Sequence, residues 1–143
     1  KGPFLTGNMI SVSSLLKNPL QFPVEWPVKG TLTREYNKEN GHFGIDIAAN
    51  KGTDFHAIAD GVVIGKSWSL NYGYVLYIQH GKGIITVYKH ASAIIPEIGA
   101  LILKGDILGH VGNTGVISSG PHLHMEIWAN GLPQNPLHYL IKS

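Results

Sequence analysis

Turn signals recur along most of this chain at intervals of roughly eight to twelve residues, which limits the length of any helix or strand. Eighteen glycines are spread through 143 residues, and short Val/Ile/Leu runs lie between them. The clearest runs are 61–65, 74–80, 84–90, 99–109 and 123–128, the last of which is expected to be the final strand. Short apolar strands between turns are typical of sandwiches and barrels. The pattern therefore predicts an all-β fold with an antiparallel core, in which 74–80 and 84–90 form a hairpin.

Residues 1–29 differ from the rest because Pro19, Pro23 and Pro27 oppose a continuous helix or strand ladder. We expect this segment to be a short, irregular lead-in that packs on the domain formed by residues 30–143. A chain of this length can bury one ordinary hydrophobic core, so a single domain is predicted.

Charge and cysteine content exclude several classes of function. The formal net charge is +2, and the 11 basic residues are scattered, so the basic stripe expected for nucleic-acid binding is missing. No apolar run approaches the ~20 residues that a membrane-spanning helix needs. The chain has no cysteine, which leaves His, Asp and Glu as possible metal ligands.

Two groupings among the eight histidines point to a metal site. Residues i and i+2 of a strand share a face, so His122 and His124 would lie side by side. His42 and Asp46, four residues apart around Gly44, could face one ion from a bend. Each grouping alone is a moderate or weak signal, since a lone histidine is more often solvated or hydrogen-bonded than a ligand. Together they favour zinc, whose catalytic sites offer three nitrogen or oxygen ligands and an open position for water.

The other histidines have different expectations. His90 and His122 are available to act on a zinc-bound water and on a developing oxyanion. His56 is expected to pack or to form a hydrogen bond. His80, His110 and His138 lie beside turn residues, so turn or surface positions are predicted for them.

From about Gly30 to Pro136 the chain resembles the lysostaphin-type (LytM-like) zinc metallopeptidases, which cleave peptides of peptidoglycan. The motifs that carry this resemblance occur in the family's order and spacing: Gly41-His42-Phe43-Gly44-Ile45-Asp46-Ile47, Ala57-Ile58-Ala59-Asp60-Gly61-Val62-Val63, Tyr88-Lys89-His90, Gly112-Asn113-Thr114-Gly115 and Gly120-Pro121-His122-Leu123-His124-Met125-Glu126. The resemblance implies an antiparallel β core with zinc in a groove between loops. This chain departs from many relatives at residues 34–41, where those relatives carry a longer Phe-Gly-x-Arg stretch.

The resemblance also implies residue roles and a location. His42, Asp46 and His124 would be the zinc ligands, His122 the general base, and His90 a group that stabilises the oxyanion. Tyr36 and Asn113 are the expected substrate contacts, and Glu126 is a possible partner of an imidazole. The predicted protein is a peptidoglycan endopeptidase of the bacterial cell envelope, periplasmic or extracellular, that binds one zinc ion per monomer.

Two alternatives of other classes stay open at this point. A non-catalytic wall-binding or amidase-regulating module could keep the fold and act through its groove on a partner. Lys104-Gly105-Asp106 in a glycine-bounded strand pair also suggests a carrier or histidine phosphotransfer domain. That last reading ranks lowest, because it gives Asp46 no use beside His42.

Overall fold

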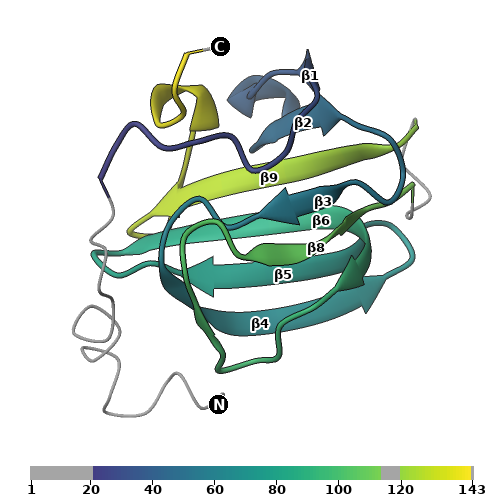
Figure 1. Cartoon of the computed structure of the whole chain (residues 1–143). Coiled ribbons are helices and arrows are strands. Elements are labelled where there is room, and N and C mark those ends of the chain that lie inside the picture. The colour runs from purple at the N-terminus through teal and green to yellow at the C-terminus, as the bar shows by residue number, and fades with distance from the viewer. Residues whose placement is uncertain (1–20, 114–119, 143) are drawn as a thin grey trace.

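The computed structural model describes residues 21–113 and 120–142 (Figure 1). Its strands are β1 (Thr31–Arg34), β2 (Ile45–Ala48), β3 (Asp54–His56), β4 (Gly61–Ser69), β5 (Gly73–Gln79), β6 (Ile84–Ile94), β7 (Leu101–Ile102), β8 (Ile107–Val111), β9 (His122–Ala129) and β10 (Leu132–Gln134). The described residues also contain two short 3-10 helices, η2 (Lys38–Asn40) and η3 (Pro136–His138). The predicted all-β fold is confirmed.

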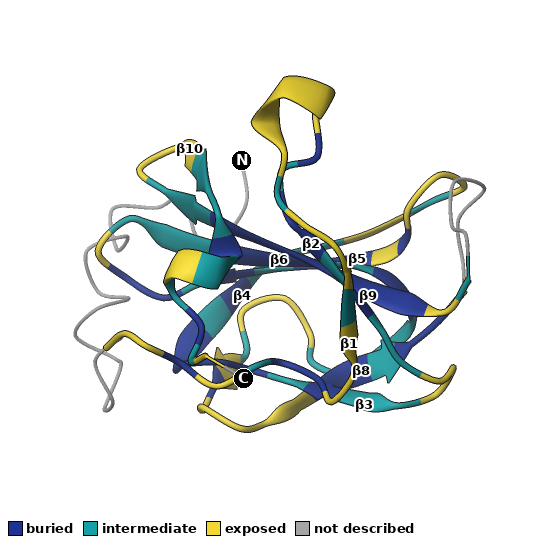
Figure 2. Cartoon of the chain, turned by 90° about the horizontal axis from the view of Figure 1, so that it is seen from above, coloured by how far each residue is buried: buried dark blue, intermediate teal, exposed yellow. Residues whose placement is uncertain are grey.

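The strands form one antiparallel sheet that folds over itself. Its main path runs β1-β2-β9-β6-β5-β4-β7, with β10 beside β9. Strand β8 pairs with both β3 and β6. Figure 2 shows two layers: β3 and β8 lie in the lower part of the picture, and the layer that contains β4, β5, β6 and β9 lies above them. The antiparallel core with two packed layers is the arrangement that the short strands predict.

Strand β6 connects the two layers by changing partners along its length. Residues 84–89 pair with β9, whereas residues 91–94 pair with β8. His90 lies at the switch and has a φ of 67°, a left-handed backbone conformation that is uncommon for a residue other than glycine. Strands that pass between packed sheets bend at such irregular positions. Because of this bend, the side chain of His90 does not point in the direction that strict alternation along a straight strand would give it.

Strict alternation along β9 separates the core from the functional face. Leu123, Met125 and Ile127 are fully buried against residues of β2, β6 and the second layer. His122 and His124 occupy the alternate positions and turn to the opposite face, because successive side chains of a strand point to opposite sides. One strand therefore holds the hydrophobic core with one face and presents imidazoles on the other.

Two expectations about the strands have different outcomes. The predicted hairpin is confirmed as β5 and β6, which pair from Gln79↔Ile85 to Tyr74↔Ala91. The expectation that 123–128 is the final strand is wrong, because β10 pairs with β9 immediately after the turn at Asn130 and Gly131. Pro133 in the middle of β10 hides this strand from a sequence pattern, since proline is tolerated only in edge strands.

The described part of the lead-in runs beside the C-terminal segment. The amide of Val24 donates to the carbonyl of Tyr139, and the amide of Ile141 donates to that of Val24, each over 2.8 Å. The indole of Trp26 donates to the carbonyl of Ile141. Residues 1–20 lie outside the described residues, and the boundary at residues 29 and 30 stays a prediction. Among the described residues, none of the helices is long and apolar enough to cross a membrane.

Candidate metal centre

Three neighbouring strands align the residues at the centre of the candidate site. In the register of the sheet, Asp46 on β2 is opposite His124 on β9, and His124 is opposite Lys89 on β6. Directly opposed residues of an antiparallel pair have Cβ atoms about 4.5–5.5 Å apart, so their side chains meet on the shared face. Asp46 and His124 are 78 residues apart in the sequence and are brought together by this pairing.

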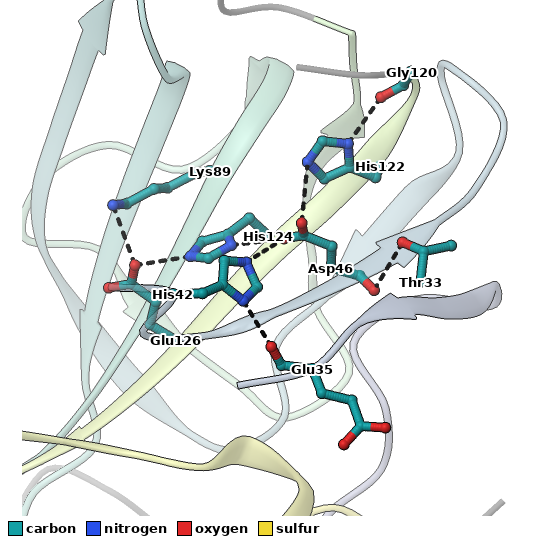
Figure 3. Close-up of polar contacts among 9 residues, drawn as sticks. All are labelled: Thr33, Glu35, His42, Asp46, Lys89, Gly120, His122, His124 and Glu126. Atoms are coloured by element: carbon teal, nitrogen blue, oxygen red, sulfur yellow. Dashed lines mark hydrogen bonds and ion pairs between the residues drawn. The ribbon is translucent and has the colours of Figure 1, made fainter. Parts of the chain in front are cut away.

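His42, Asp46 and His124 converge with their donor atoms within 4.8 Å of one another (Figure 3). Asp46 Oδ1 lies 2.7 Å from His124 Nδ1 and 3.3 Å from His42 Nε2. Two ligands of a tetrahedral zinc ion, each about 2.0–2.2 Å from the metal, are roughly 3.3–3.6 Å apart. The donor set of two imidazoles and one carboxylate therefore fits a zinc ion in its chemistry. The 3.3 Å pair has the spacing of two zinc ligands, whereas the 2.7 Å pair is hydrogen-bonded in this structure.

Three imidazoles, those of His42, His122 and His124, are each held from outside by one ring nitrogen, which leaves the other nitrogen facing Asp46. His42 Nδ1 donates to the carbonyl of Glu35 at 2.8 Å, and His122 Nδ1 donates to the carbonyl of Gly120 at 2.8 Å (Figure 3). The outer partner of His124 is a carboxylate, that of Glu126, 2.8 Å from Nε2. Metal-binding histidines usually have such an outer acceptor, which fixes the ring and its tautomer.

His90 and His122 lie beside the three candidate ligands. Their ring centroids are 4.8 Å apart, and the His90 ring is 6.4 Å from that of His124. His122 Nε2 is 3.9 Å from Asp46 Oδ2. The backbone of His90 is fixed from two sides, because its amide donates to the carbonyl of Tyr72 and its carbonyl accepts from the amide of Gly112. Four imidazoles therefore share one side of the sheet.

These groups line an open groove of about 450 Å³. Besides the four histidines and Asp46, its walls are formed by Thr33, Arg34, Gly41, Phe43, Tyr72, Lys89 and Glu126. The four histidines are almost fully buried, with 5–9% of their surface exposed. The groove can therefore admit an extended chain to a site whose imidazoles are shielded from bulk water.

Buried charges in the groove shift one another's pKa. Burial alone would raise the pKa of Asp46, but the hydrogen bond with His124 and the charges of three histidines lower it. Burial would lower the pKa of His124, but its hydrogen bonds to Asp46 and Glu126 raise it. Burial opposes ionisation of Glu126 too, yet hydrogen bonds from His124 and Trp128 and the nearby Lys89 lower its pKa to about 2. Asp46 and Glu126 are thus ionised at neutral pH.

The expected bend between His42 and Asp46 is present at Gly44. The positive φ of 73° in this region belongs to Gly41, which ends η2. A Cβ atom at Gly44 would lie 2.9 Å from His124 Cε1 and closer still to the carbonyl of Met125. Gly44 is therefore needed for the close approach of the chain to β9 as well as for the bend.

Tyr36 and Asn113, the expected substrate contacts, do not line the groove in the described part of the chain. The hydroxyl of Tyr36 donates to the carbonyl of Pro133 at 3.4 Å. Asn113 is exposed and directly precedes residues 114–119, which lie outside the described residues. Their roles stay predictions.

The histidines outside the groove lie in different surroundings. His80 lies beside a turn, as predicted, but it is buried with 2% exposed, so the alternative of a surface position is wrong. Its Nδ1 donates to the carbonyl of Asp60 and its Nε2 accepts from the Thr86 hydroxyl. The residue directly follows β5, where the chain is still inside the fold. His56 is half-buried on β3, and His110 on β8 lies 2.9 Å from a carboxylate oxygen of Asp54.

Sequence reasoning missed Lys89, which lines the groove beside Tyr72. Lys89 Nζ lies 4.3 Å from the centre of the Tyr72 ring and 3.2 Å from Glu126 Oε2. The signal for Lys89 was available, because it is adjacent to His90 on β6 and must alternate with the buried Tyr88.

Comparison with known proteins places this arrangement in a family. The model of "Peptidase family M23" matches residues 40–136. DD-carboxypeptidase/endopeptidase Mpg of Neisseria meningitidis is 45% identical over 96 residues, which is 67% of this chain and 22% of that protein. The structure of Helicobacter pylori Csd3 is 34% identical with a TM-score of 0.74, covering 85% of this chain and 34% of that one.

Another relative is named as an activator of hydrolases. Murein hydrolase activator EnvC of Escherichia coli is 34% identical over 119 residues, which is 80% of this chain and 28% of that protein. This chain thus spans less than a third of the curated relatives named here.

Proposed function

This chain belongs to peptidase family M23, and on that premise we propose that it is a zinc-dependent endopeptidase that hydrolyses peptide bonds of peptidoglycan. The observation that carries the proposal is the convergence of His42, Asp46 and His124, with His90 and His122 beside them, in an open groove. A metal triad alone would suit a structural site. Two further imidazoles facing the same space suit a site that moves protons.

In this proposal His42 Nε2, an oxygen of Asp46 and His124 Nδ1 hold the metal. Zinc, when bound, makes water acidic enough to attack near neutral pH and withdraws electron density from a peptide carbonyl. His122 accepts the proton of the attacking water at Nε2, because its Nδ1 is engaged by the carbonyl of Gly120. His90 donates a hydrogen bond to the developing oxyanion.

The names of the relatives support the substrate. Mpg is a DD-carboxypeptidase/endopeptidase, and ShyC of Vibrio cholerae, 38% identical over 95 residues, is a peptidoglycan DD-endopeptidase. By this likeness we place the protein in the bacterial cell envelope, periplasmic or extracellular, where it acts on peptidoglycan peptides. We further propose that it acts as a monomer. The short stem peptides of peptidoglycan fit a groove that is open rather than closed over its contents.

A second candidate is a regulator that stimulates another wall hydrolase without cutting bonds itself, as the likeness to an activator suggests. A regulator needs neither a base nor an oxyanion donor. The presence of His90, His122 and all three candidate ligands in this chain therefore favours the peptidase.

The experiment that tests the proposal is digestion of purified peptidoglycan, followed by the release of free amines and the mass of the soluble products. The parent protein is expected to release new amines, whereas His124→Ala is expected to release none. His110→Ala, which removes a half-exposed histidine of β8 outside the groove, is the matched control and should match the parent. A parent that releases no amines but stimulates a purified wall amidase would make the protein a regulator.

A further inference from the structure

Among the described residues that line the groove, Glu126 is the one carboxylate that stands outside the candidate ligand set and yet contacts it. It lies on β9 two residues beyond His124 and is only 6% exposed. Its Oε2 accepts from His124 Nε2 at 2.8 Å (Figure 3). Burial of a carboxylate is unfavourable unless its oxygens are satisfied, so this position has to be maintained by specific partners.

Two neighbours hold Glu126 in place. The indole of Trp128 donates to Oε1 at 2.9 Å, and Lys89 Nζ lies 3.2 Å from Oε2. Lys89 is itself fixed, since its ammonium group also lies over the ring of Tyr72. Both carboxylate oxygens are therefore engaged, and the side chain has little freedom to turn away from His124.

We infer that Glu126 is a positioning residue for the metal: by accepting a hydrogen bond from His124 Nε2, it aims His124 Nδ1 at the ion, and Trp128 and Lys89 hold it there. The inference rests on the proposed metal site. It distinguishes His124 from His42 and His122, whose outer acceptors are neutral backbone carbonyls. A charged acceptor makes the ring a stronger donor to metal, and loss of such a partner typically weakens metal affinity about 10–100-fold.

The test is the zinc affinity of the metal-free protein, measured by competition with a chelating dye at constant neutral pH. Glu126→Ala is expected to weaken zinc binding by about 10–100-fold. Glu126→Gln should fall between the parent and Glu126→Ala, because the amide oxygen can still accept from Nε2. Trp128→Phe keeps an aromatic ring but removes the donor to Oε1, so it should give a smaller loss in the same direction.

Thr86→Val is the matched control. It destabilises the interior around His80, away from the groove, and should bind zinc as tightly as the parent if it remains folded. A Glu126→Ala protein with the parent's zinc affinity would overturn the inference. A loss of zinc affinity in Thr86→Val as large as that in Glu126→Ala would overturn it too, because it would indicate a general loosening of the fold. If Glu126→Ala does not fold, an unchanged zinc affinity in Trp128→Phe would overturn the inference. A parent that binds no zinc would instead contradict the proposed function.

Discussion

His124 and His80 are both buried, with 7% and 2% of their surfaces exposed, yet their surroundings shift the imidazole pKa in opposite directions. His80 lies in the interior, where burial lowers its pKa to about 4, and the Asp60 carbonyl and carboxylate only partly offset this. His124 lies in the groove between the carboxylates of Asp46 and Glu126, which raise its pKa despite burial. Burial of a histidine therefore does not indicate its role. The charge of its partners does.

The comparison also explains how one fold supports a polar site beside an apolar core. His80 is satisfied as a neutral ring, which donates to one neighbour and accepts from the other. The groove instead places two carboxylates, those of Asp46 and Glu126, beside four imidazoles and the ammonium group of Lys89. A bound cation would compensate the charge of these carboxylates, which is the physical basis for proposing a metal in the groove.

The largest expected effect is that of Asp46→Ala. The carboxylate lies nearest to both His42 and His124, so its removal takes away a ligand and leaves their nitrogens without an anionic partner. We expect zinc affinity to fall by more than the ~100-fold upper value typical of outer partners, and wall hydrolysis to be lost with it. Dye competition and amine release measure the two effects. Retained zinc binding would exclude Asp46 from the ligand set.

His122→Ala should separate metal binding from catalysis. The ring lies 3.9 Å from Asp46 but is not needed to complete the ligand triad. We expect zinc to stay bound and the turnover rate to fall by about 10²–10⁴-fold, the usual contribution of a general base. Elemental analysis and the rate of amine release provide the two measurements. Hydrolysis at the parent's rate would show that His122 is not the base.

His80 should make the metal-free protein less stable as the pH falls from about 6.5 to about 4. In that window the unfolded chain binds a proton at this residue and the folded chain does not, so the free energy of unfolding decreases with falling pH. The shift from 6.5 to about 4 corresponds to about 3 kcal/mol. The raised pKa of His124 acts with the opposite sign, because stability from that ring is lost as the pH rises.

Urea unfolding at several pH values measures this dependence, with His80→Gln as the test variant. The glutamine amide can donate to Asp60 and accept from Thr86 but does not titrate. We expect His80→Gln to flatten the slope between about pH 6.5 and pH 4, whereas His110→Gln should retain it. An unchanged slope in His80→Gln would assign the dependence to other groups.

Thr86→Val should give the smallest of these effects. It keeps the volume of the side chain but removes the hydroxyl that donates to His80 Nε2 at 2.8 Å. An unsatisfied buried acceptor costs about 1–3 kcal/mol, and we expect a loss near 1 kcal/mol in the free energy of unfolding at neutral pH. Urea denaturation detects such a change. A variant as stable as the parent would mean that the ring does not need this donor.

Local pattern was sufficient for the parts of the site that depend on strand alternation. The period of two along 122–126 predicts that His122 and His124 share a face and that Leu123 joins the core, as in β9. The short glycine-bounded runs likewise predict the all-β fold. These features depend on neighbours in the sequence and on the geometry of a single strand.

Features that depend on distant contacts could not be predicted in the same way. The register that sets Asp46 opposite His124 is a property of two strands far apart in the chain. The requirement for glycine at Gly44 comes from the passage of the chain over β9. The burial of Glu126 needs Trp128 and Lys89 on the same face, and the direction of His90 comes from the change of partner along β6. The register, the close approach at Gly44 and the direction of His90 leave no local signal, whereas Glu126 and Trp128 follow the same period of two as His124.

The central claim is that the groove binds a catalytic zinc ion, and the most direct measurement is zinc content per chain alongside amine release from purified peptidoglycan, before chelation, after it and after zinc is restored. The account predicts about one zinc per chain, hydrolysis that stops when the metal is removed, and recovery when zinc is returned. Hydrolysis that persists without metal, or a folded chain that binds no zinc, would contradict it.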